Sequence, residues 1–335
     1  MRLARVPLAG HPDHVCDLIA AGIADEYLRR DPDTRIRCHV SGGLGAIFVT
    51  GEVLTKADFD VSHLVQRLLG QYGIYEAMEP FVALEHVTSE QVRRFRFATT
   101  EPLLVTGYAT NVTESFLPAP MHWAKKLAAA LELKRKNDQD WFWLGSSGWV
   151  SVLGDAKSLL EVTVQVDHGA QPIEIVRGAI TLEFEDMGGD KVARLKVNPL
   201  GESVRQGIES SIGKSQSLIL PYGQNLPSAA NPAGRDWHAA EVTGAWLARY
   251  VAKQVLKSTG AQAVMSELVY LPGEEYPAKI TARDERGRDV SQAFKWSRET
   301  LAEKVAGWRK TGLMSEAVKA NLVGELSLPW ERTDA

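Results

Sequence analysis

The sequence is poor in cysteine and has no long hydrophobic run. Its 335 residues include only Cys16 and Cys38, too few for a disulfide framework and typical of a protein in a reducing compartment. No secretory hydrophobic segment is found, and no apolar run reaches 18 residues, so a membrane-spanning protein is not expected. These absences favour a cytoplasmic protein.

Excess positive charge is also missing. The formal net charge is −4 and the isoelectric point is near 6.1, whereas nucleic-acid binding depends on neutralising phosphates with basic groups. With 44% hydrophobic and 24% charged residues, the chain can bury a large core and divide into two or three domains. The composition therefore predicts an ordinary globular protein that binds no nucleic acid.

The densest group of chemically active side chains stands near the start, in the Gly-His-Pro-Asp sequence of residues 10–13. Pro12 fixes its own φ angle and biases His11 toward an extended conformation, which makes a stiff corner. Apolar residues follow at helical spacing over 15–23, so Asp13 is expected in the first turn of a helix. The unpaired amides and positive dipole there suit a phosphate that a carboxylate-bound Mg²⁺ could bridge.

Two other interpretations of this corner stay open. Asp13 can be a simple helix-capping residue beside an incidental histidine. A zinc site formed by His11, Asp13, His14 and Cys16 is less favoured, because these four residues crowd into one corner and no second cluster follows downstream.

Hydrophobic periodicity further along the chain alternates between strands and helices. Strands are predicted at 36–40, 46–49, 103–108, 160–167, 195–197, 218–220, 264–271 and 278–283, and helices at 58–71, 119–134, 239–257 and 299–309. Residues 171–184 fit either a helix or a strand, and 72–100 and 201–236 are irregular. The alternation predicts an α+β protein built from similar layers.

Four short stretches stand in a fixed order along most of the chain: Gly10–Asp13, Gly107–Asn111, Asp155–Ser158 and Ala248–Lys253. The second of them runs on to Pro118–Pro120. Each stretch alone could arise by chance, but their shared order makes chance a poor explanation. Together they resemble the S-adenosylmethionine synthetase (methionine adenosyltransferase) family, of which this chain would be a divergent and shortened member.

The resemblance implies a fold and an assembly. The family is built from three similar sheet-plus-helix α+β domains in a pseudo-threefold arrangement, which implies domains at residues 1–98, 99–220 and 221–335. It also implies a homodimer or a dimer of dimers, formed through broad sheet faces with active sites between subunits.

The resemblance further implies a reaction in which methionine sulfur displaces triphosphate from C5′ of ATP, before the triphosphate is hydrolysed to diphosphate and phosphate. A neutral thioether is already nucleophilic, so the main demands are in-line alignment and stabilisation of the leaving group. The resemblance implies that the catalytic residues are His11, Lys157 and Arg235. It implies that Mg²⁺ is bound by Asp13 and Glu241. It also implies that the substrate and nucleotide are contacted by Glu52, Glu101, Asp155, Lys214 and Asp236.

Several residues depart from the family pattern. His39 stands where the family has a glutamate associated with its monovalent-cation site, so a requirement for K⁺ is doubtful. Arg5 replaces an acidic residue, Ala239 replaces a second phosphate-side lysine, and Ser203 stands where an aromatic residue commonly packs on adenine. These departures keep two alternatives open: a relative that uses another acceptor, or a non-catalytic nucleotide-binding or regulatory homologue that pairs with a conventional synthetase.

Overall fold

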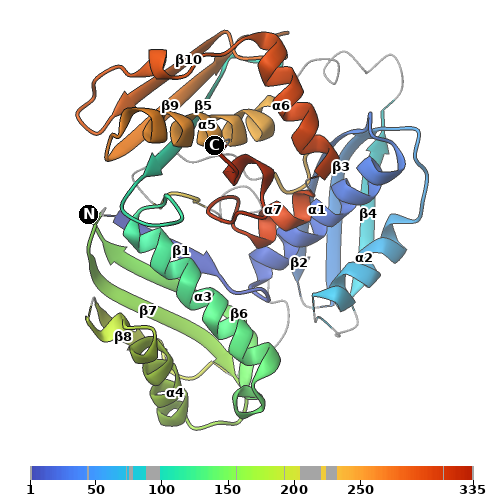
Figure 1. The fold of residues 1–335 in the computed structure, drawn as a ribbon. Coiled ribbons are helices and arrows are strands. Elements are labelled where there is room, and N and C mark those ends of the chain that lie inside the picture. The colour runs from blue at the N-terminus through green and yellow to red at the C-terminus, as the bar shows by residue number, and fades with distance from the viewer. Residues whose placement is uncertain are drawn as a thin grey trace.

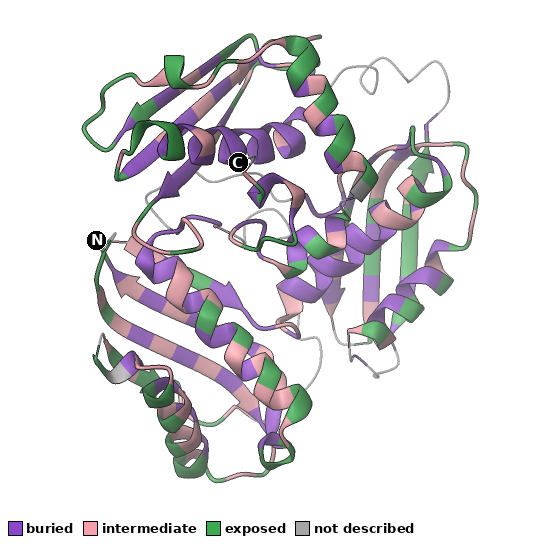
Figure 2. Cartoon of the chain, in the orientation of Figure 1, coloured by how far each residue is buried: buried purple, intermediate pink, exposed green. Residues whose placement is uncertain are grey.

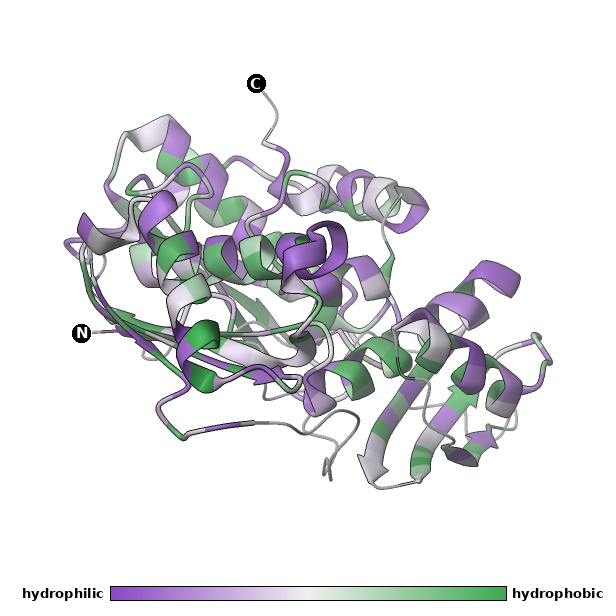
Figure 3. Ribbon diagram, turned by 90° about the horizontal axis from the view of Figure 1, so that it is seen from below, coloured by the Kyte–Doolittle hydropathy of each residue, from purple (hydrophilic) through white to green (hydrophobic). Residues whose placement is uncertain are grey.

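The structure is a computed structural model that describes residues 2–43, 45–72, 74, 78–87, 99–155, 157–191, 193–203, 220–223, 232–311 and 313–333. Within these residues the chain forms three β-sheets, each with one face toward helices (Figure 1). In Figure 3, which is turned by 90°, the helices make the upper layer and the sheets the lower layer. The predicted α+β fold is confirmed.

The three sheets differ in size and strand order. The first sheet has the order β2 (Arg35–Gly43), β3 (Ala46–Leu54), β4 (Glu79–His86). The central sheet has the order β1 (Arg2–Pro7), β6 (Leu144–Gly154), β7 (Leu159–His168), β8 (Arg194–Val197). The third sheet has the order β10 (Lys279–Asp284), β9 (Ala263–Tyr270), β5 (Leu103–Thr110). The helices are α1 (Pro12–Arg30), α2 (Val61–Gln71), α3 (Ala119–Asn137), α4 (Ile173–Asp186), α5 (Ala240–Thr259), α6 (Arg298–Thr311) and α7 (Met314–Lys319).

The first two sheets share one order of elements, which the residue identities do not reveal. Each begins with a helix (α1 or α3), continues with an antiparallel hairpin (β2–β3 or β6–β7), and ends with a crossover helix and a parallel strand. A parallel strand needs such a crossover, which α2 and α4 provide. The third sheet begins in the same way, with α5 followed by the antiparallel pair β9–β10.

The strands that precede α1 and α3 in the sequence, β1 and β5, each pair within the sheet formed by later elements of the chain. β1 pairs with β6, with Arg2 opposite Gly154, and β5 pairs with β9, with Leu103 opposite Tyr270. The sheets therefore do not follow the expected boundaries after residues 98 and 220. Local periodicity carries no information about which distant strand a segment will pair with, so the sequence could not place these two strands.

Most expected elements are present, and the exceptions have local causes. The ambiguous residues 171–184 form α4, whose buried Val176, Ile180 and Phe184 recur every four residues. β1 and β4 were not predicted; β4 lies in the irregular region of 72–100, and its solvent face carries the exposed Phe81. The expected strand at 218–220 falls almost wholly outside the described residues.

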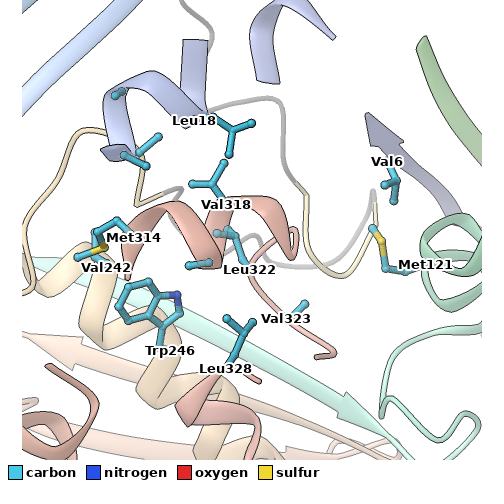
Figure 4. Close-up of a cluster of buried hydrophobic side chains, with 14 of the residues drawn as sticks. Val6, Leu18, Met121, Val242, Trp246, Met314, Val318, Leu322, Val323 and Leu328 are labelled. Atoms are coloured by element: carbon cyan, nitrogen blue, oxygen red, sulfur yellow. The ribbon is translucent and has the colours of Figure 1, made fainter. Parts of the chain in front are cut away.

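The core lies between the helices and the sheets (Figure 2). Figure 4 shows how α7 and the turn after it fill the centre of the molecule, with Val318 near Leu18 of α1 and Leu322 above Trp246 of α5. The opposite faces of the sheets are only partly buried, as the alternating burial of β6 and β7 shows. Among the described helices, none has the length and hydrophobicity needed to cross a bilayer.

Candidate functional site

The corner at residues 10–13 carries the chain from β1 into α1. His11 precedes the helix with φ −58° and ψ 129°, Pro12 occupies its first turn, and Asp13 follows in the same turn. The amide of Gly10 donates to the carbonyl oxygen of Ser146 at 2.8 Å, which ties the corner to the central sheet. A side chain at position 10 would lie 2.1 Å from Ser146 Oγ, so this approach requires glycine. The predicted position of Asp13 is confirmed.

Arg5 contacts the corner from the open face of β1. Its Nη2 lies 3.0 Å from His11 Nε2. Because a guanidinium only donates, Nε2 is the acceptor, and a neutral His11 ring carries its proton on Nδ1. Burial and then the charge of Arg5 lower the pKa of His11 to about 4, against the opposing charge of Asp13. The ring is therefore neutral at pH 7, and its buried Nδ1 has no hydrogen-bond partner among the described residues.

A second group of charged side chains forms on the open face of the first sheet. Arg37 of β2 is opposite Glu52 of β3, and on its other side it forms a β-bridge with Arg235. Directly opposed residues in antiparallel pairs point to the same face, so these three side chains are neighbours. Glu241, in the first turn of α5, lies 3.7 Å from Arg235.

Two glycines allow this group to assemble around β2. A Cβ at Gly51 would lie 2.1 Å from the carbonyl oxygen of Arg37, and a Cβ at Gly234 would lie 2.1 Å from that of Cys38. Their φ angles of 141° and 70° also suit glycine. Each glycine immediately precedes a charged residue of the group, so the Gly-Glu and Gly-Arg pairs have a steric reason.

Asp155 and Lys157 occupy the turn between β6 and β7. The Asp155 carboxylate accepts hydrogen bonds from the amides of Lys157 and Ser158, both at 2.8 Å, and these bonds lower its pKa. Lys157 Nζ donates to Gln262 Oε1 at 3.1 Å. The turn is exposed and borders the third sheet.

The corner and this turn lie at opposite ends of β6. Arg2 is opposite Gly154 and Pro7 is opposite Trp149, and Gly10 lies beside Ser146. A strand rises about 3.4 Å per residue, so the two ends are more than about 20 Å apart. A single chain does not bring His11 and Lys157 to one phosphate group.

The other three residues expected at the site lie apart from these two groups or outside the described residues. Asp236 is 3% exposed, and its carboxylate accepts bonds from the amides of Ile36 and His238 at 2.8 Å, so it joins residues 232–239 to β2. Its burial raises its pKa. Glu101 is exposed just before β5. Lys214 lies outside the described residues.

Comparisons with known proteins agree on one family. The family model for the N-terminal domain of S-adenosylmethionine synthetase matches residues 5–93. S-adenosylmethionine synthase 1 of Rhodospirillum rubrum is 26% identical over 363 residues, covering 97% of this chain and 94% of the relative. The synthase of Petrotoga mobilis is also 26% identical, with the same two shares. Over nearly its whole length the chain is therefore similar to S-adenosylmethionine synthases, at 26% identity.

The chain is shorter than one of these relatives within the aligned region. Its alignment with the Petrotoga mobilis synthase runs over 382 positions, more than the 335 residues of this chain, so the relative has segments that this chain lacks. The solved structure of an unusual S-adenosylmethionine synthetase from Campylobacter jejuni superposes with a TM-score of 0.80 at 19% identity, covering 100% of this chain and 97% of that chain. The fold is therefore retained.

Arg5 and Arg37 were not among the site residues expected from the sequence, although the structure places Arg5 against His11 and Arg37 beside Glu52. Arg5 stands between the buried Ala4 and Val6, so the two-residue period of a strand could have placed it on the open face. Arg37 could have been found by counting back from the hairpin turn, which sets it opposite Glu52. Neither position was expected to contact the site.

The side chains of the site limit which metal ion it could hold. Among the described residues, no three His, Cys, Asp or Glu side chains gather as a metal-binding group, so the zinc alternative finds no support there. Mg²⁺ commonly takes one or two carboxylates together with substrate phosphates. A single carboxylate beside the first amides of α1, as Asp13 provides, fits that pattern, whereas Glu241 is already paired with Arg235.

Proposed function

We propose that this chain transfers the adenosyl group of ATP to the sulfur of methionine. The sulfur lone pair forms the bond to C5′ while the C5′–O bond breaks, and triphosphate leaves with the electron pair. Triphosphate is then hydrolysed to diphosphate and phosphate. The observation that carries the proposal is the corner itself: a neutral imidazole with an unused N–H beside a carboxylate in the first turn of α1.

The corner meets the needs of the leaving group. The His11 N–H would donate to the oxygen that bridges ribose and triphosphate, where negative charge gathers as the bond breaks. The first amides of α1 would receive a phosphate. Asp13 would hold Mg²⁺, which neutralises phosphate charge when bound.

The second group suits the remaining charges of the substrates. Glu52 would accept the ammonium group of methionine, and Arg37 and Arg235 would bind carboxylate or phosphate oxygens. Arg37 and Arg235 are adjacent across the β-bridge, so their two positive charges act on the same anion. Glu241 already offsets part of the charge of Arg235 and would reach a metal only if that ion pair opened.

The separation of His11 and Lys157 requires a second copy of the chain. The open face of the first sheet offers an apolar surface for it: Phe48 and Phe81 are 45% and 52% exposed and stack with ring centroids 5.2 Å apart. A homodimer formed through the open sheet faces would place the Asp155–Lys157 turn of one subunit near the corner of the other. Each active site would then use residues of both subunits.

A product assay tests the proposal. The purified protein is incubated with ATP, methionine and Mg²⁺, with and without K⁺, and products are identified by mass spectrometry. S-adenosylmethionine with diphosphate and phosphate supports the proposal. ATP binding without turnover would favour a nucleotide-binding regulator, and an adenosylated product formed only with another acceptor would change the substrate.

Mixed dimers test whether the site is shared. His11→Ala and Lys157→Ala proteins are each expected to be inactive, and refolding them together should restore activity. About half of the dimers would be mixed and each would hold one intact site, so recovery should reach about a quarter of the wild-type rate. If both residues served the same site from one chain, every site in the mixture would carry a defect and no activity would return.

A further inference from the structure

Arg5 stands on the open face of the central sheet, beside the corner at residues 10–13. It lies on β1 between the buried Ala4 and Val6, and successive side chains of a strand point to opposite faces, so its side chain points away from the helices. The residue is exposed. An arginine keeps its positive charge at any pH near neutrality, so the charge is presented on this open face, next to His11.

Both groups that contact the Arg5 guanidinium are uncharged. Its Nη2 lies 3.0 Å from Nε2 of the neutral His11 ring. Its Cζ lies 6.0 Å from the ring of Trp149, a diagonal neighbour on β6. Among the described residues no carboxylate forms an ion pair with Arg5, and Asp13 acts on it through its charge without a hydrogen bond. The positive charge is therefore available to an anion from outside the chain.

The position of Arg5 indicates which anion this is. In the proposed function, His11 lies at the oxygen between ribose and triphosphate, and the first amides of α1 receive a phosphate. A guanidinium in contact with the same imidazole is within reach of the phosphate oxygens, and its planar fork of N–H groups matches two oxygens of one phosphate. We propose that Arg5 binds the triphosphate of ATP directly. This inference rests on the proposed function only in taking the corner as the place where phosphates bind.

Binding of inorganic tripolyphosphate tests the proposal without any need for catalysis. Calorimetric titration in a buffer with Mg²⁺ compares the wild-type protein with Arg5→Ala, which should bind at least about tenfold more weakly, the usual cost of losing a hydrogen bond to a charged group. Arg5→Lys keeps the charge without the fork and should lose less. Unchanged affinity in Arg5→Ala would overturn the proposal, as would a wild-type protein that does not bind tripolyphosphate.

A matched control removes the same charge from another surface. Arg67 is an exposed arginine of α2, on the helix side of the first sheet. Arg67→Ala lowers the net charge by the same amount as Arg5→Ala, and its affinity for tripolyphosphate should stay within about twofold of the wild-type value. Equal losses in the two variants would overturn the proposal, because they would report the net charge of the protein and not a contact at the corner.

A double variant separates a direct contact from an effect through His11. If Arg5 contacts the phosphates, Arg5→Ala should weaken tripolyphosphate binding by a similar factor in the wild-type and His11→Ala proteins. No further loss in the His11→Ala protein would overturn the proposal, because Arg5 would then act only by holding the imidazole.

The affinity for ATP assigns the contact to the nucleotide. Because Arg5 would contact only the phosphates, Arg5→Ala should weaken ATP binding by about the same factor as tripolyphosphate binding. A loss for tripolyphosphate with unchanged ATP affinity would overturn the assignment to ATP. These readouts are binding alone, so failure of adenosyl transfer would leave them intact. Formation of S-adenosylmethionine with unchanged tripolyphosphate affinity in Arg5→Ala would overturn this inference and leave the proposed function standing.

Discussion

Replacing His11 with alanine should lower kcat for S-adenosylmethionine formation by about 10²–10³-fold, the usual cost of removing a donor that stabilises developing negative charge. Affinity for ATP should change far less. His11 already has a partner at Nε2 in Arg5, so the substitution removes one specific group, the Nδ1–H, and not the positive charge of the site. Single-turnover kinetics and calorimetric ATP binding measure the two effects separately.

Two further variants sharpen this test. His11→Asn keeps an N–H donor near the same place and should recover part of the rate. His63→Ala removes an exposed histidine from the surface of α2 and should leave kcat and ATP affinity unchanged. Equal losses of kcat and ATP affinity in His11→Ala would contradict a leaving-group role, because they would indicate a contact made equally before and during bond breaking.

The local part of this fold was predictable, and the long-range part was not. Apolar spacing located α3 and α5, and strict alternation located β7, because both periods are properties of neighbouring residues. The pairing of β1 with β6 could not be predicted in this way, since β6 lies in another part of the sequence. The pairing of β5 with β9 was hidden for the same reason.

The candidate site also has a part that was predictable from local sequence and a part that was not. Pro12 and the helical spacing after it were sufficient to place Asp13 in the first turn of α1. Arg235 lies beside Arg37 because Gly234 packs against β2. No local sequence pattern predicts this packing. The distance between His11 and Lys157 likewise follows only from the register of β1 on β6.

Some stretches that carried the family resemblance are structural. Gly107 packs so closely on α5 that a Cβ there would lie 2.2 Å from the backbone of Ala248. Arg249, next along α5, donates to the carbonyl oxygen of Tyr108 at 2.6 Å and to the Glu331 carboxylate at 2.9 Å. These residues hold the third sheet and the C-terminal segment together, so their presence in the sequence reports on the fold.

Glu331→Gln should destabilise the protein by about 3–5 kcal/mol, the usual loss when one partner of a buried ion pair is removed. The Glu331 carboxylate is 1% exposed and pairs with both Arg249 and Lys253, at 2.9 Å and 2.7 Å. A neutral amide would leave two buried cations without a countercharge. Urea denaturation at a fixed protein concentration measures the change, with Glu174→Gln as the control. Glu174 forms an exposed pair with Arg177 at 3.0 Å, which should contribute less than about 1 kcal/mol.

The same carboxylate predicts a loss of stability in acid. Burial opposes its ionisation, but Arg249 and Lys253 outweigh burial and lower the pKa of Glu331 from 4.5 to about 2. A group whose pKa is lower in the folded state stabilises the fold above its unfolded-state pKa and loses that contribution as pH falls through the folded-state value. The wild-type protein should therefore lose stability between about pH 4.5 and pH 2, and Glu331→Gln should lose less over this range. Parallel curves for the two proteins would show that the pKa of Glu331 is the same in the folded and unfolded states, and a stabilising buried ion pair would then have to be abandoned.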